Sequence, residues 1–523
     1  MKDPRVRQRG MEGWRARQAH GEWRGIDAGP QIDGTPGPGQ WDRCSEELKE
    51  RETRAKGLEK PRCGETSSYA QTTLFAVQEA TRQEFKTTLH LAWPVVLTQV
   101  SVMTMGMVDM VMVGALGKVE LGAVGLGSSI FVTVAMSMAG IMIAMDALVG
   151  QRFGEGNKKQ CANLLWQGYW VSLFIGIPLT FLFFDSAWIT TLLGQSDAVS
   201  AASGEYLDGR AWSTTFLLLF ASQRAFLSGI GNTRSIFYIA LVTNLVNVVA
   251  DWILIYGNLG APALGVLGAG YATSISQITM FVLAIFVVHA KGYRSQYPLS
   301  FRLPEKRAIT HVLRIGLPFS GHLFVEIGGF AAGAVIAGWV GEVELAAHQV
   351  TMTLASFTFM IPLGIGSAAS IRVAQQIGAE DSDGAYLAGK IALRLGVGAA
   401  VISALTFILI PTVLAGVFSD DLQVVSVAAM LLVIAGMFQV FDALQVVAAG
   451  CLRGTGDTQA PFLANLVAHW LIGLPLGYLL AIEYEWGVSG LWVGFTAALA
   501  LVGTTMSWRF LGGKWRGIGS VFD

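Results

Sequence analysis

The chain carries an ungapped internal repeat inside a strongly apolar body. Residues 94–154 match residues 318–378 at a constant offset of 224 positions. Membrane proteins built from two homologous halves usually enclose a substrate path at the interface between the halves. The repeat therefore favours a transporter with two related lobes. Identical residues at this offset include Pro94 and Pro318, Gly117 and Gly341, Gln151 and Gln375, and Gly154 and Gly378.

The composition separates a polar tail from a membrane body. Hydrophobic residues make up 53% of the chain and charged residues 14%, against roughly 25% charged residues in soluble domains. The first 87 residues hold 16 of the 36 lysines and arginines. Residues 1–80 are too polar to form a core, so we expect a disordered tail there. The tail has no apolar h-region, which argues against a secretory signal peptide.

Twelve apolar runs are long enough to cross a bilayer, which takes ~20 residues. They predict an all-α membrane protein with two homologous six-helix bundles. We expect an N-lobe over 81–290 (helices 1–6), a linker over 291–311, and a C-lobe over 312–523 (helices 7–12 and a short tail). The runs are 88–113, 122–147, 163–184, 205–228, 235–257, 266–290, 312–338, 344–370, 386–416, 424–451, 460–482 and 488–511.

The basic residues of the body lie almost entirely in alternate loops. One set of loops holds eighteen of the lysines and arginines that follow residue 87, and the other set holds only Lys118 and Arg210. The positive-inside rule therefore predicts that both termini are cytoplasmic. Each half has an even number of spans, so both halves enter the membrane in the same direction. We expect them to be related by an axis along the membrane normal.

Four acidic residues inside the predicted spans are candidates for ion or proton coupling. Glu326 and Asp442 lie at one depth, about 16–18 Å from the basic rim at ~1.5 Å per residue. Asp109 and Asp251 both lie towards the outer ends of their helices. An acid at the bilayer centre costs roughly 2.5–3.5 kcal/mol, so it normally faces a cavity or a partner. This predicts one polar cavity in each lobe, and the alternative is that these acids only hydrogen-bond neighbouring helices.

A fifth acid, Asp146, lies near the cytoplasmic end of its predicted span. We expect it to pair with Arg152 or Lys158, which follow it closely in the sequence. The repeat places Asp109 opposite Gly333 and Glu326 opposite Val102. The lobes therefore share an architecture without sharing their acids.

Five uncharged polar residues are candidates for lining the substrate cavity. They are Asn244, Asn247, His348, Gln349 and Gln439. The two asparagines precede Asp251 by seven and four residues, so the three share one helical face. For His348, a hydrogen bond between helices is the alternative to a role in transport.

Several function classes find no support in the sequence. No GxxxxGK[ST] segment occurs, so no nucleotide-driven pump is encoded. The four cysteines lack the spacing of a zinc site, and no clustered catalytic motif indicates an enzyme. We expect no cofactor beyond a coupling ion, no nucleic acid partner, and a monomer surrounded by membrane lipid.

From about Thr88 to Phe510, the chain resembles the multidrug and toxic compound extrusion (MATE) family, in particular its NorM-like branch. The resemblance rests on several long segments that occur in the family's order. They are MGMVDMVMVGALG, ALVGQRFGEGN, NVVADWILIYG, GLPFSGHLFVEIG, ELAAHQV, IPLGIGSAASIRVAQQIGA and FQVFDALQVVAAGCLRGTGDT.

The resemblance implies a V-shaped pair of bundles that exports organic cations and drugs across the bacterial inner membrane. It implies exchange for Na⁺ or H⁺ by alternating access. By the same resemblance, we expect Glu326 and Asp442 to bind cations, Asp109 to take part in ion coupling and Asp251 in proton coupling. Na⁺ is thus possible at Glu326, Asp442 or Asp109, and the presence of both sets of acids leaves the coupling ion open.

A lipid-linked oligosaccharide flippase of the same superfamily is the alternative function. Such a protein favours basic residues in its central cavity, to hold pyrophosphate. We interpret the membrane-embedded charges of this chain as all acidic, which favours a cationic cargo. A fixed channel fits two unlike lobes less well than alternating access does.

Overall fold

The structure, a computed structural model, describes residues 65–192 and 194–517, and this part of the chain is helical without strands. Residues 1–64 of the expected tail lie outside the described residues, whereas residues 65–80 are helical, and the prediction of disorder is wrong for them. The chain divides into two compact units, Met1–Gln83 and Glu84–Asp523. Both homologous bundles belong to the second unit.

The first bundle and the linker contain the helices from α3 to α13. They are α3 (Glu65–Gly114), α4 (Lys118–Phe131), the π-helix η1 (Val132–Met136), α5 (Ser137–Ile143), α6 (Met145–Gly154), α7 (Lys158–Phe183), α8 (Ala187–Leu192), α9 (Asp197–Ala211), α10 (Ser213–Gly229), α11 (Thr233–Tyr256), the 3-10 helix η2 (Asn258–Gly260), α12 (Gly265–Val288) and α13 (Lys291–Gln296).

The second bundle contains the helices from α14 to α21. They are α14 (Lys306–Val340), α15 (Glu342–Gly378), α16 (Ser382–Leu409), α17 (Pro411–Gly416), α18 (Leu422–Gly454), α19 (Gln459–Leu466), the π-helix η3 (Val467–Gly473), α20 (Leu474–Tyr478), the π-helix η4 (Leu479–Glu483), α21 (Val488–Leu511) and the 3-10 helix η5 (Lys514–Gly517).

Eleven helices of the described residues are long and apolar enough to cross a membrane. The remaining predicted span, 205–228, is divided between α9 and α10, which have 15 and 17 residues. Trp212, between them, keeps helical angles of φ −58° and ψ −29°. The interruption therefore affects the hydrogen bonding of a single turn.

The first helix of each bundle packs partly into the core of the other bundle. Leu91 and Ala92 of α3 belong to a core cluster that is otherwise built by the second bundle. Val312 and Ile315 of α14 belong to a core cluster that is otherwise built by the first bundle and the linker. The two first helices thus tie the bundles together, which a pair of independent six-helix bundles would not do.

Paired glycines make this exchange possible at equivalent positions. A Cβ atom added to Gly364 would lie 2.9 Å from the backbone nitrogen of Val96. A Cβ atom added to Gly140 would lie 3.1 Å from the Cα atom of Ser320. Both glycines and both partners are related by the offset of 224 residues. The bundles therefore meet with the contact pattern of a twofold pseudo-symmetric interface.

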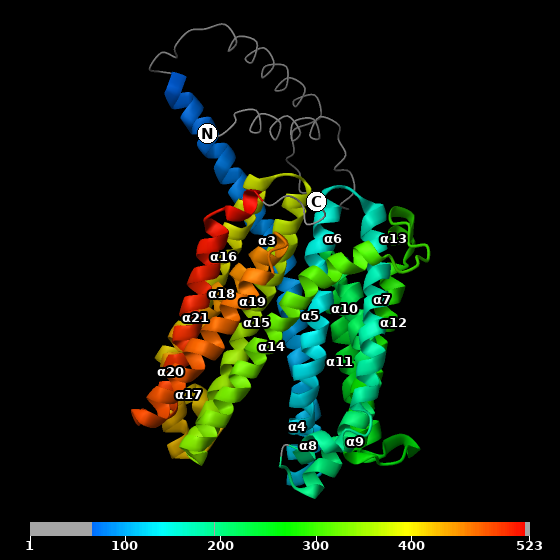
Figure 1. Cartoon of the computed structure of the whole chain (residues 1–523), viewed down its shortest axis with the longest axis vertical. Coiled ribbons are helices and arrows are strands. Elements are labelled where there is room, and N and C mark those ends of the chain that lie inside the picture. The colour runs from blue at the N-terminus through cyan, green and yellow to red at the C-terminus, as the bar shows by residue number, and fades with distance from the viewer. Residues whose placement is uncertain (1–64, 193, 518–523) are drawn as a thin grey trace. The chain divides into compact units, whose positions relative to one another are not determined.

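The bundles contact each other where α5, α6 and α10 meet α14, α15 and α18. Figure 1 shows the bundles of Glu84–Asp523 converging at α6 and α15 and separating towards α9 and α17. The converging end also carries the turns at 155–157, 230–232, 379–381 and 455–457, and we call it the basic end.

The turns of the basic end repeat one backbone design. A residue in the left-handed region ends each helix, and an Asn or Asp side chain then accepts a hydrogen bond from the next helix, which is a common way to cap helices. Three of the left-handed residues are glycines, whereas Glu380 adopts φ +59°. Left-handed residues and their caps are Gly156 and Asn157, Gly231 and Asn232, Glu380 and Asp381, and Gly456 and Asp457.

Glu380→Gly should stabilise the protein by about 1 kcal/mol, because a side chain in the left-handed region costs roughly 1–2 kcal/mol. A higher Tm of the purified protein in detergent would confirm it. The matched control is Gly156→Ala, the repeat-equivalent position, where an added Cβ meets no atom within 4 Å. That substitution should lower the Tm through backbone strain alone. An unchanged or lower Tm for Glu380→Gly would contradict the prediction.

Candidate functional site

The N-lobe acids Asp109 and Asp251 come together between α3, α11 and α12. Asp109 is 4% exposed and Asp251 is fully buried. Thr273 of α12 donates a hydrogen bond from Oγ1 to Asp109 Oδ2 at 3.0 Å. The two carboxyl groups are close enough for their charges to interact. Two ionised carboxylates are acceptors only, so a proton or a bound cation would stabilise the pair.

Unpartnered polar atoms surround the N-lobe pair. Within the described residues, no donor reaches Asp109 Oδ1 or either carboxyl oxygen of Asp251. Asn247, one turn earlier on α11 and also fully buried, has no partner for its amide nitrogen or oxygen. Buried polar atoms are normally satisfied. This concentration of unsatisfied acceptors fits a site that binds a proton or a small cation.

The C-lobe acid Glu326 lies in a network of polar side chains. Gln445 of α18 donates from Nε2 to Glu326 Oε1 at 3.1 Å. His322, one turn earlier on α14, places its Nε2 atom 3.3 Å from Glu326 Oε2. Asn465 of α19 contacts the His322 ring, with an Nδ2 to Nδ1 distance of 3.1 Å. No arginine or lysine of the described residues lies within ion-pair distance of Glu326.

Asp442 and His469 complete the C-lobe group. Asp442 of α18 is 5% exposed and close enough to Glu326 for their charges to interact. His469 is 1% exposed and lies in the π-helix η3, with no partner for its Nε2 atom among the described residues. π-Helical turns are rare and frequently occur at functional sites. The C-lobe thus contains a second buried group whose acids have no lysine or arginine partner in the described part of the chain.

The predicted cavity residues divide between the two groups and the helix packing. Asn244 donates to the Ser101 carbonyl and hydroxyl oxygens at 2.7 Å each, and so joins α11 to α3. His348 accepts from Trp492 Nε1 at 3.2 Å, which joins α15 to α21. Gln439 donates to the Ala355 carbonyl at 3.3 Å, and Gln349 is exposed. Asn244, His348 and Gln439 thus join neighbouring helices, and Asn247 alone among the five predicted residues lies one helical turn from an acid.

The prediction for Asp146 is wrong, because its partners lie in the other lobe. Arg453 of α18 approaches Asp146 Oδ2 at 3.3 Å, and Ser370 of α15 donates to Oδ1 at 3.1 Å. Arg152 instead pairs with Glu155, three residues later, at 2.6 Å. Asp146 faces the C-lobe across the interface, so its neighbours in the sequence do not determine its partner.

The interpretation that all embedded charges are acidic is also wrong. Arg453 is 5% exposed and stacks on the Phe319 ring at 4.6 Å from the centroid. Arg224 lines a cavity together with Asp146 at the lobe interface. Both arginines lie near the basic ends of their helices, where a sequence count assigns them to loops. Their side chains face the opposite lobe.

The sequence reasoning also missed His322, His469 and Asn465 of the C-lobe group. His322 precedes Glu326 by four residues, and this spacing puts two side chains on one helical face. The sequence therefore contained a signal for His322. Asn465 and His469 belong to a later helix, and only the tertiary fold brings them to Glu326.

Two homologous bundles of membrane-spanning helices, each with a buried acid group, define an integral membrane transporter. The MatE family model matches residues 94–253 and 318–479, which is once in each bundle. The chain belongs to this family.

Curated relatives agree with this assignment over most of the chain. "Multidrug resistance protein NorM" of Vibrio vulnificus (strain CMCP6) is 32% identical over 438 residues, which cover 82% of this chain and 96% of the relative. "Probable multidrug resistance protein NorM" of Rhizobium meliloti (strain 1021) is 33% identical over 433 residues, covering 82% and 93%. The relatives support drug efflux as the general activity.

Solved structures show the same fold at lower identity. The eukaryotic MATE transporter AtDTX14 superposes with a TM-score of 0.78 at 22% identity, covering 84% of this chain and 97% of that one. A MOP superfamily transporter from Pyrococcus furiosus gives a TM-score of 0.76 at 18% identity, covering 82% and 95%. The binding pocket of the Pyrococcus transporter has reverse polarity, which suggests a different function for that protein. The shared fold therefore does not identify the cargo, which depends on the side chains of the site.

Asp251→Asn should raise the stability of the protein, because it removes a buried carboxyl group whose oxygens have no donor. Asp146→Asn should lower it, because Arg453 would lose its ionic partner. A buried group left without its partner costs about 1–3 kcal/mol, so we expect Tm shifts of opposite sign. Thermal unfolding of both variants in detergent would measure them. Shifts in the same direction would contradict this assignment of paired and unpaired acids.

Proposed function

We propose that this protein is a secondary antiporter that exports organic cations and drugs in exchange for Na⁺ or H⁺ by alternating access. The coupling ion binds at Asp109 and Asp251 in the N-lobe and at Glu326 and Asp442 in the C-lobe. The protein works in the bacterial plasma membrane with its basic end towards the cytoplasm, and the distribution of lysines and arginines between the loops supports this orientation.

The observation that carries the proposal is a pair of buried acid groups, one in each lobe, without a lysine or an arginine in ion-pair contact among the described residues. A desolvated carboxylate without a counter-ion is unstable, so each group must take up a proton or a cation. Such uptake and release, alternating between two sides of a membrane, is how an ion gradient drives transport. The bacterial relatives named as multidrug resistance proteins support drugs as the cargo.

The charges near the acid groups favour a cationic cargo over a lipid-linked oligosaccharide. The pyrophosphate of such a lipid needs free basic side chains in the cavity. Arg453 is committed to Asp146 and stacks on Phe319. Arg224 is therefore the single basic residue of this interface that supports the flippase alternative, within the part of the chain that the structure describes, and it lies beside Asp146.

Purified protein in proteoliposomes should export a fluorescent organic cation when a proton or a sodium gradient is imposed. Asp109→Asn, Asp251→Asn, Glu326→Gln and Asp442→Asn remove one ion-binding charge each. We expect each to slow export at least tenfold, equivalent to about 1.4 kcal/mol. Running each variant under each gradient would also identify the coupling ion of each lobe.

Glu342→Gln is the control, because it neutralises an exposed acid in the first turn of α15. It should export at the rate of the unsubstituted protein. Export that ignores both gradients, or that survives all four substitutions, would overturn the antiport mechanism. Transfer of a lipid-linked oligosaccharide without export of the organic cation would favour the flippase.

A further inference from the structure

The interface at the basic end joins the lobes by two kinds of contact. The first kind is neutral and symmetric. Gln151 donates from Nε2 to the Gly454 carbonyl at 3.0 Å, and its repeat equivalent Gln375 donates to the Gly229 carbonyl at 2.9 Å. These two bonds cross the interface in both directions and hold the basic end closed.

The second kind of contact is charged and consists of two ion pairs, Glu84 of α3 with Arg372 of α15 at 2.7 Å and Asp146 with Arg453. Neither has a symmetric counterpart among the described residues. Asp146 of the N-lobe pairs with Arg453 of the C-lobe, and Ser370 bonds to both, with Arg453 Nε 3.1 Å from its hydroxyl oxygen. The offset of 224 places Ser370 itself opposite Asp146. Matching LRGTGD at 452–457 with LSGIGN at 227–232 places Ser228 opposite Arg453. The Asp146–Arg453 ion pair was therefore added to an interface that neutral bonds already close.

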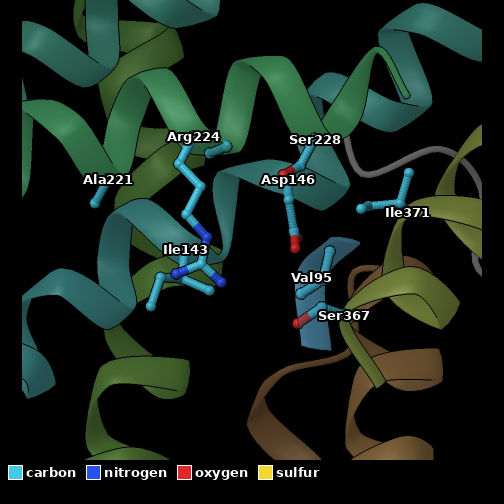
Figure 2. A pocket seen from close by; sticks show the side chains of 9 residues that line it. Val95, Ile143, Asp146, Ala221, Arg224, Ser228, Ser367 and Ile371 are labelled. Atoms are coloured by element: carbon cyan, nitrogen blue, oxygen red, sulfur yellow. The ribbon is translucent and has the colours of Figure 1, made fainter. Parts of the chain in front are cut away.

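A second arginine, Arg224, lies in the same pocket as the Asp146 carboxylate. Figure 2 shows Arg224 of α10 and Asp146 of α6 reaching into one pocket, with Ser228 and Ser367 nearby. The charge of Asp146 acts on Arg224. Among the described residues, no group forms a hydrogen bond or an ion pair with the Arg224 guanidinium. The cavity volume is about 10 Å³, roughly the space of one water molecule and far below the ~300–1,000 Å³ of small-molecule sites, so a cargo site there is disfavoured.

The two arginines belong to different lobes. Arg224 lies on α10, which packs against α6 within the N-lobe, so it accompanies Asp146 when the lobes move. Arg453 and Ser370 lie in the C-lobe and would move away from Asp146 together with that lobe. Opening the basic end would then leave the buried Asp146 carboxylate without its partner, and breaking a buried ion pair is strongly unfavourable when the remaining charge is unpaired.

We propose that Asp146 exchanges ion-pair partners during transport. It pairs with Arg453 while the basic end is closed and with Arg224 while the basic end is open. Arg224 is thus a positioning residue that keeps the carboxylate neutralised and lowers the barrier to opening. This inference deepens the proposed function and rests on its alternating access.

The test measures the distance between spin labels on Cys residues at positions 158 and 382, in a chain whose native cysteines are replaced by alanine. Lys158 and Ser382 are repeat equivalents, are exposed, and begin α7 and α16 at the basic end. With Asp146, Arg224 and Arg453 all present, the labelled protein should show two populations, one with a short and one with a long distance between the labels. Arg224→Met should lose the long distance and slow export at least tenfold, whereas Arg453→Met should enrich the long distance.

Two further variants separate charge exchange from a general loss of structure. Arg224→Lys keeps the positive charge and should restore both distances and most of the export. In an Asp146→Asn background, Arg224→Met should have no further effect on the distances, because both substitutions remove the same pair. Each variant is compared only if it unfolds cooperatively on heating in detergent, which shows that it is folded.

Arg224→Met would overturn the exchange if it left the distances unchanged or enriched the long one as Arg453→Met does. A protein that never reaches the long distance would overturn both the exchange and alternating access. A protein that switches between the two distances without exporting any organic cation would sink the proposed cargo and leave the exchange supported.

Discussion

The cost of burying a carboxylate in an apolar body organises this structure. Each of the five acids inside the predicted membrane spans must be neutralised by a proton, a bound cation or an arginine. Asp146 uses Arg453, whereas Asp109 and Asp251 face each other and Glu326 faces His322 and Gln445. The acid with an arginine lies at the lobe interface, and the acids without one lie inside the lobes. This division separates the contact that holds the lobes together from the groups that can take up an ion.

The lobes are physically continuous with one another, although the repeat describes them as separate bundles. The first helix of each lobe enters the core of the other, through the close approaches at Gly140 and Gly364. Cores packed at crystal-like density transmit displacement with little loss. In the proposed mechanism, protonation or cation binding near Asp109 on α3, or near Glu326 on α14, acts on a helix that packs against both lobes. The exchange of first helices gives a direct mechanical route from the acid groups to the interface.

The sequence predicted the parts of the molecule that depend on local pattern. Apolar run lengths and the 224-residue offset determine the helices and the homology of the bundles, and helical depth correctly grouped Asp109 with Asp251. The sequence pattern could not predict which residues contact each other across the interface between the lobes. Asp146 was assigned to Arg152 because a sequence offers only neighbours, whereas its partner Arg453 is 307 residues away. His348 and Gln439 look like cavity residues on composition, but their orientation towards α21 and α15 is a property of packing.

The repeat explains why the interface and the acid groups evolved different degrees of symmetry. A twofold interface requires the same surface on both sides, and the bonds of Gln151 and Gln375 meet this requirement with backbone carbonyl acceptors. Backbone acceptors stay the same when side chains change, so the closed interface tolerates divergence between the lobes. The acid groups need no such match, because each is enclosed by the helices of one lobe. Symmetry is therefore retained where the lobes bind each other and lost where each lobe holds its acid group, and the Asp146–Arg453 and Glu84–Arg372 pairs are asymmetric charges within the symmetric interface.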